Sequence, residues 1–159
     1  MKKIPLTQGN FVLVDDADFE WLNKYIWRPK KTKYTYYARR RSKGKEIQMA
    51  RQILNPPSHL HCDHINHNGL DNRRSNLRIC TISQNQHNSK LRSDSTSGFK
   101  GVYWDRDLNK WRVRISINKK VIWLGSYTCL IEAAKVYDAA AIKYYKEFAN
   151  LNFPERNKQ

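Results

Sequence analysis

A polar stretch at residues 89–98 divides this chain into two parts with different residue patterns. The stretch consists mainly of serine, threonine, glycine and charged residues and has no apolar periodicity, which is typical of a linker. Histidine and asparagine are frequent just before it, whereas apolar and polar residues alternate after it. In a chain of 159 residues, this break favours two small domains over one medium domain.

Positive charge is spread over both parts of the chain. The formal net charge is +16, with 16 basic and 7 acidic residues in 1–88 and 14 and 7 in 89–159. A basic excess along the whole chain favours an extended polyanion, above all nucleic acid, as the partner. An anionic lipid surface, or a basic surface that serves only solubility, is the alternative.

The cysteines and the apolar runs indicate the cellular compartment of such a chain. There are three cysteines and no C-x-x-C pair, so neither a disulfide framework nor a four-cysteine zinc site is expected. We find no apolar run that would span a membrane and no signal-peptide pattern. The expectation is an intracellular, cytoplasmic protein of a bacterial or phage-infected cell that does not contact a membrane.

Residues 1–57 predict short strands and turns. A strand is expected at 11–14 and a short helix around 16–25. The segment 24–51 contains eleven basic residues and one acid, with Tyr34, Tyr36 and Tyr37 among them. This mixture suits a groove that follows phosphates as well as it suits a solvated basic face on a small sheet.

Residues 98–154 predict a three-stranded antiparallel sheet packed on one α-helix. Apolar and polar residues alternate over 111–117, a tight turn is expected at 118–120, and further strands are expected at 99–104 and 121–124. Thr128 is the expected cap of a helix that runs to about Lys146. Its inward stripe is expected to hold Ala133, Tyr137, Ala140 and Tyr144.

The segment 58–90 carries the residues suited to chemistry. A strand ending at His64, a polar loop, a strand near 77–80 and a helix from about Ser83 would form a ββα hairpin in which Asn85 faces Asp63 and His64. Phosphodiester hydrolysis needs a base and a cation. His64 suits the base, and Asp63 and Asn85 offer oxygen ligands for Mg²⁺ or Mn²⁺. The expected phosphate contacts are Arg73, Arg74 and Arg78.

A zinc site is the competing interpretation of the same segment. Its candidate ligands would be Cys62, His64, His67 and Cys80. Their spacing matches none of the usual zinc patterns, so structural zinc is not expected.

The run D-H-I-N-H-N-G-L-D-N-R-R-S-N-L-R-I-C-T from Asp63, followed by Q-N-Q-H-N, resembles the HNH homing endonucleases of phages and mobile introns. A weaker similarity extends upstream, so the resemblance covers residues 6 to about 90. It implies that His64 is the general base, that Asp63 and Asn85 bind the metal, and that Asn76 braces the loop and the histidine. Relatives commonly have Met-His-Arg where this chain has Met-Ala-Arg, with Ala50 in the middle.

The runs G-F-K-G-V-Y-W, K-W-R-V-R-I, W-L-G-S-Y and E-A-A-K-V-Y-D-A-A-A resemble the Apetala/ethylene-response-factor (ERF) DNA-binding domain over residues 98–154. The resemblance implies a sheet that enters the major groove. Tyr103, Asp105 and Ser116 stand near positions where the family has base-contacting arginines, so the plant target sequence does not carry over. The expected DNA contacts are Lys100, Arg106, Arg112, Arg114, Lys119, Lys120 and Trp123.

The sequence therefore predicts an α+β chain in four parts. These are a β-rich part of the nuclease at 1–57, a ββα-metal HNH core at 58–90, a linker at 91–97 and an ERF-type domain at 98–154. The expected function is that of a site-directed, metal-dependent endonuclease that acts on double-stranded DNA, as a monomer. The alternatives are a DNA-binding regulator with an inactive nuclease, which Ala50 supports, and a structural zinc protein.

Overall fold

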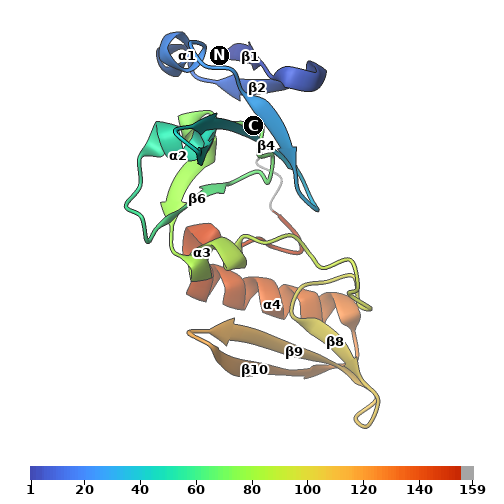
Figure 1. The fold of residues 1–159 in the computed structure, drawn as a ribbon. Helices are drawn as coiled ribbons and strands as arrows, with labels where there is room; N and C mark the ends of the chain where they lie inside the picture. The colour runs from blue at the N-terminus through green and yellow to red at the C-terminus, as the bar shows by residue number, and fades with distance from the viewer. Residues whose placement is uncertain (155–159) are drawn as a thin grey trace. The chain divides into compact units, whose positions relative to one another are not determined.

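The computed structural model describes residues 1–154, in two compact units whose boundary lies between Asn85 and Gln86. Each unit has a hydrophobic core of its own. The elements of the first unit are β1 (Lys2–Pro5), β2 (Phe11–Val14), α1 (Asp16–Leu22), β3 (Arg28–Lys31), β4 (Tyr36–Ser42), β5 (Lys45–Gln48), α2 (Met49–Leu54), β6 (His61–His64) and β7 (Leu77–Cys80) (Figure 1). Helix α3 (Ile82–His87) crosses the boundary, and the second unit holds β8 (Val102–Asp105), β9 (Lys110–Ile117), β10 (Lys120–Tyr127) and α4 (Leu130–Tyr145).

Three small antiparallel sheets build the first unit. Strands β1 and β2 pair, β4 lies between β3 and β5, and β6 pairs with β7. Their apolar side chains and those of the two short helices share one core, formed by Ile4, Leu6, Val12, Val14, Leu22, Trp27, Ala38, Met49, Ala50, Ile53 and Leu77. The β6–β7 hairpin is therefore anchored in the same core as the N-terminal strands.

The two helices of the first unit differ from what the sequence predicts. One is shorter than expected, and the other was not expected. The strand expected at 11–14 is β2, but the helix expected around 16–25 ends at Leu22. The indole nitrogen of buried Trp27 donates to the carbonyl oxygen of Leu22 at 2.9 Å, so a side chain takes over a carbonyl at the helix end. Residues 49–54 form α2, where only strands and turns are expected.

The second unit is a three-stranded antiparallel sheet, in the order β10-β9-β8, with α4 across one face (Figure 1). Val113 and Ile115 of β9 are buried, whereas Arg114 and Ser116 between and beyond them are exposed. Asn118 and Lys119 both have positive φ, as in a two-residue hairpin turn between β9 and β10. The predicted sheet packed on one helix is thus confirmed.

Two details of α4 were predicted wrongly. Its N-cap residue is Cys129 and not Thr128. The inward aromatic at its end is Tyr145 and not Tyr144, which is 40% exposed. The Tyr145 hydroxyl donates to the carbonyl oxygen of Ser116 at 2.8 Å, which fixes this ring against β9. Tyr145 follows Tyr137 by eight residues, whereas the predicted Tyr144 would follow it by seven. The buried stripe of α4 is therefore shifted by one position at its end.

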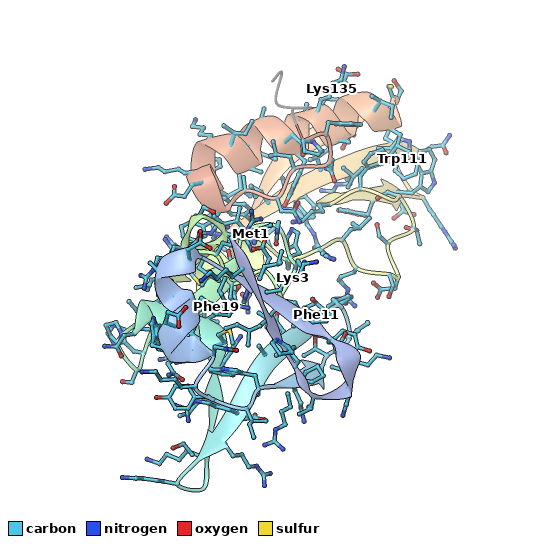
Figure 2. All side chains as sticks on the ribbon, turned by 90° about the horizontal axis from the view of Figure 1, so that it is seen from above. Met1, Lys3, Phe11, Phe19, Trp111 and Lys135 are labelled. Atoms are coloured by element: carbon cyan, nitrogen blue, oxygen red, sulfur yellow. The ribbon has the colours of Figure 1, made fainter. Side chains whose placement is uncertain are left out.

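The exposed residues of α4 include charged side chains and also the apolar Ile131 and Ile142, and Figure 2 shows Lys135 on the side of the helix away from the sheet. Within residues 1–154, no helix has the length and the apolar composition that a bilayer crossing requires.

Candidate functional site

The β6–β7 hairpin places Asp63 and His64 at the end of a strand. Asp63 lies opposite Arg78, and His64 lies opposite Leu77. Their side chains alternate, so Asp63 faces one side of the hairpin and His64 the other. Both residues are buried, with 6% and 5% of their surface exposed. The Asp63 carboxylate is still near enough to counteract the lowering of the His64 pKa.

His64 is held by two side chains that the sequence did not single out for this purpose. Its Nε2 lies 3.4 Å from Oδ1 of Asn72, and its ring centroid lies 5.5 Å from that of Tyr37. Burial lowers the pKa of His64 below its usual 6.5, against the opposing effects of Asn72, Asp63 and Asp71. The imidazole is therefore neutral at pH 7, the state that a general base needs.

The contact with Asn72 also selects the tautomer of His64. An amide oxygen only accepts, so this contact favours the tautomer of the neutral ring in which Nε2 carries the proton. The Nδ2 of Asn72 donates to the carbonyl oxygen of Gly69 at 3.2 Å, which fixes the orientation of the amide. Asn72 therefore positions His64, and its place within the D-N-R-R run was the only sequence indication.

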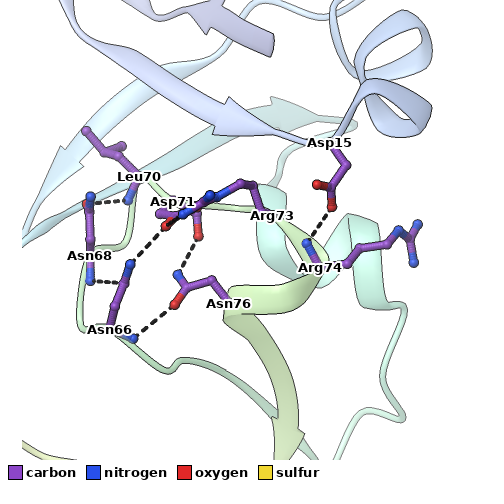
Figure 3. A network of polar contacts seen from close by, with 8 residues as sticks. All are labelled: Asp15, Asn66, Asn68, Leu70, Asp71, Arg73, Arg74 and Asn76. Atoms are coloured by element: carbon purple, nitrogen blue, oxygen red, sulfur yellow. Dashed lines mark hydrogen bonds and ion pairs between the residues drawn. The ribbon is translucent and has the colours of Figure 1, made fainter. Parts of the chain in front are cut away.

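Asn76 ties together the loop between β6 and β7 (Figure 3). Its Oδ1 accepts from the backbone N–H of Asn66 at 3.0 Å, and its Nδ2 donates to the carbonyl oxygen of Asp71 at 2.8 Å. Asn66 also donates to the Asp71 carboxylate, and the Oδ1 of Asn68 accepts from the backbone N–H of Leu70. Asn76 thus spans the loop that carries Asn72.

The same loop is fastened to the N-terminal strands. Backbone hydrogen bonds join Leu13 of β2 to Leu70 and Asn72, each at 2.8 Å. The backbone N–H of Gly69 donates to the hydroxyl of Thr35. The geometry of the His64 surroundings therefore depends on residues more than thirty positions upstream.

The three arginines expected at phosphates each bind a carboxylate in this structure. Arg73 pairs with Asp71, Arg74 with Asp18, and Arg78 with Asp63, at 2.6–2.8 Å. Arg74 and Asp18 are 56 positions apart. The side chains of Arg73 and Arg74 remain 36% and 53% exposed, against 14% for Arg78. A phosphate contact by any of the three stays a prediction.

Asn85 is placed by the start of α3. The hydroxyl of Thr81 accepts from the N–H of Gln84, and the Gln84 side chain accepts from the N–H of Thr81, so the helix begins with a capping box. The helix starts at Ile82, near the predicted Ser83, and Asn85 follows at the beginning of its second turn. Its meeting with Asp63 on a shared cation stays a prediction.

The four candidate zinc ligands do not share one face of the hairpin. Cys80 lies opposite His61, on the side of Asp63, whereas Cys62 and His64 face the other side. Burial raises the pKa of the Cys80 thiol to about 11, which disfavours the thiolate that zinc binds. Within residues 1–154, no group of three or more histidine, cysteine or acidic side chains is gathered as a metal site.

The sheet face of the second unit that is turned away from α4 carries arginine and aromatic side chains. The Arg112 guanidinium lies 4.2 Å from the centroid of the Trp123 ring, and that of Arg114 lies 5.4 Å from the Tyr103 ring. Arg112 also pairs with Asp105 at 3.1 Å. Trp123 is half exposed, whereas Trp111 packs against the core. Such a stacked arrangement holds the guanidinium groups in place with their edges toward solvent.

The expected lysine contacts of the second unit differ in their surroundings. Arg106 and Lys119 are exposed on the turns of the sheet, and Lys120 is exposed at the start of β10. The Lys100 ammonium instead donates to the carbonyl oxygens of His87 and Ser89, and burial lowers its pKa to about 8. Lys100 is thus bound to its own chain, and its contact with phosphate stays a prediction.

Gly69 is the most space-restricted position near His64. A Cβ at this residue would lie 2.4 Å from the carbonyl oxygen of Tyr36 and 2.6 Å from the ring of Tyr37. We expect Gly69→Ala to lower stability by about 1–3 kcal/mol and to displace Tyr37 from His64. Thermal unfolding measures the first effect, with exposed Ser75→Ala in the same loop as the control. An unchanged melting temperature would show that the loop has room to move.

Ala50 lies on α2 with no exposed surface, between Met49 and Ile53 of the core. The histidine common in relatives would have to enter this core. We expect Ala50→His to destabilise the chain by about 1–3 kcal/mol, because added side-chain volume forces its neighbours apart. Denaturant unfolding tests this, together with a cleavage assay. A variant that is equally stable and cuts faster would instead support the interpretation that Ala50 marks a damaged nuclease.

Comparisons with known proteins match both units. The AP2 domain family matches residues 97–147. A protein of Acanthamoeba polyphaga mimivirus described as an uncharacterized HNH endonuclease is 30% identical over 153 residues, which cover 91% of this chain and 76% of the relative. Protein 3.8 of Escherichia phage T7 is 33% identical over 64 residues, which cover 40% of this chain and 53% of that protein.

Proposed function

Since this chain belongs to the HNH endonuclease family and carries an AP2 domain, we propose that it is a site-directed DNA endonuclease with His64 as its general base. The observation that carries the proposal is the buried imidazole of His64, held by Asn72 next along the strand from the buried Asp63. In this proposal β6, β7 and α3 form the ββα-metal module of the family. The partner is double-stranded DNA, and the chain acts as a monomer.

A divalent cation, Mg²⁺ or Mn²⁺, would be held by Asp63 and Asn85. A buried carboxylate and a side-chain amide are hard oxygen donors, which these ions prefer. When bound, the ion neutralises charge on the phosphate and stabilises the departing oxygen.

The chain's own residues supply the remaining chemistry. His64 Nδ1 takes the proton of the attacking water, while Nε2 keeps its contact with Asn72. Asn76 preserves the loop geometry and so positions the histidine through Asn72. Arg78, which pairs with Asp63, is the arginine nearest the proposed cation and would contact a phosphate held by that cation.

The second unit directs the first to its DNA. Its AP2-type sheet carries Arg112, Arg114 and Trp123 on one exposed face, and such a face fits the edges of bases in a major groove. Two modest DNA-binding units in one chain raise each other's effective concentration on a duplex.

Supercoiled plasmid incubated with the protein and Mg²⁺ tests the proposal. We expect nicked or linear DNA that a chelator prevents, and mapping of the ends on both strands gives the cleavage site. DNA that is bound tightly but stays intact in Mg²⁺ and in Mn²⁺ would favour a non-cutting regulator.

A further inference from the structure

One face of the β3–β4–β5 sheet carries a row of basic side chains beside the His64 site. Residues that pair across antiparallel strands share a face, and the face changes at every step along a strand. Arg28 pairs with Arg39, and Lys30 pairs with Tyr37. Tyr37, Arg39 and Arg41 of β4 therefore lie on one side, and buried Ala38 lies on the other, in the core. We call Arg28, Lys30, Arg39 and Arg41 the arginine face.

The arginine face has more positive than negative charge. The acid on this side is Glu46, which lies opposite Arg41 and hydrogen-bonds Arg39. That bond, and the nearby charges of Lys30 and Arg28, hold the pKa of Glu46 below its usual value. One carboxylate thus offsets one of four cations, and the rest of the charge is directed to solvent.

A pocket of about 480 Å³ opens where the N-terminal turn meets this sheet, lined by Thr7, Gln8, Ile26, Arg28, Arg40 and Arg41. Its lining includes three arginines and no carboxylate. The Arg40 guanidinium lies 4.0 Å from the Tyr25 ring centroid and donates to Gln52 at 2.9 Å, so it is held in a defined place. Arg28 and Arg41 are exposed. One fixed and two exposed guanidinium groups around this hollow suit a phosphate oxygen.

We propose that the arginine face and this pocket bind the phosphate backbone of the DNA next to the scissile bond. This inference rests on the proposed nuclease function, because His64 defines where the bond lies. Tyr37, whose ring contacts His64, and Arg41 are four residues apart on β4, which corresponds to about 13 Å along a strand. A DNA strand advances about 3.4 Å per nucleotide along the helix axis. With β4 aligned along the duplex axis, this separation corresponds to about four nucleotides between the pocket phosphate and the cut.

The test compares the double variant Arg28→Ala/Arg41→Ala with the control Lys135→Ala/Lys143→Ala, which removes the same charge from exposed residues of α4. Binding to a labelled duplex is measured in chelator over a range of salt concentrations. Affinity falls as salt rises, and loss of two phosphate contacts makes this dependence shallower. The magnitude of the slope of log affinity against log salt decreases by about 2, equally on target and unrelated duplexes. On the target duplex, the variant also loses protection of the backbone within about six nucleotides of the mapped cut.

The proposal is overturned if the double variant keeps the wild-type slope and footprint, or if the control pair lowers the slope as much. Failure of the nuclease function looks different: wild-type protein then binds DNA but cuts nothing in Mg²⁺ or Mn²⁺. In that event, the salt slopes still decide whether the arginine face contacts DNA.

Discussion

Replacing His64 by alanine should slow DNA cleavage by about 10²- to 10⁴-fold, while DNA binding stays near the wild-type level. The expectation follows from the position of the ring: it is buried, Asn72 holds its Nε2, and burial lowers its pKa, which favours the neutral form that accepts a proton. Rates are best measured with excess enzyme on a duplex that contains the mapped cut site, and binding is measured separately in chelator.

His61→Ala is the matched control, because His61 lies on the same strand and is exposed. A further variant, His64→Gln, keeps most of the buried volume, and its melting temperature separates loss of the base from loss of folding. The assignment of the base is wrong if His64→Ala cuts as fast as His61→Ala.

Removing both Arg112 and Arg114 should abolish selective binding to the DNA target. An arginine that reads a base edge contributes about 1–3 kcal/mol, so loss of both weakens binding on the order of 30-fold to 10⁴-fold. The geometric reason is that both guanidinium groups lie against Trp123 on the exposed face of the sheet. Binding to an unrelated duplex should change far less, because neither the wild type nor the variant makes specific base contacts on that duplex.

The measurement is the ratio of target to non-target affinity at one salt concentration. Lys135→Ala/Lys143→Ala again serves as the control, since it removes the same charge from exposed residues of α4. If the arginine variant keeps its affinity ratio, the specific contacts lie elsewhere.

The alternation of buried and exposed residues in β9, and the polar loop of the hairpin, could be predicted because both depend on the local pattern of apolar and polar residues. Val113 and Ile115 point inward for the same reason that Arg114 points outward. The end of α1 could not be predicted, because it depends on Trp27, which reaches back to the Leu22 carbonyl. Helix α2 is only six residues long, too short for helical periodicity to be distinguished from a strand.

The roles of the basic residues around His64 depend on contacts distant in sequence. Arg74 looked like a phosphate ligand, yet its partner Asp18 comes from the N-terminal helix. Tyr37 was predicted as part of a basic and aromatic segment, and only the tertiary structure places its ring beside His64. Residue types and spacing predict which groups are chemically suited to a task, but not which acid a given arginine meets.

The backbone hydrogen bonds between Leu13 and the loop at Leu70 and Asn72 have a consequence for engineering this protein. A graft of the histidine hairpin onto another scaffold would leave its loop without the edge strand that shapes it. A portable cutting cassette would therefore have to begin upstream of β2 and extend through α3. Shorter transplants would carry the chemical groups and lose their alignment.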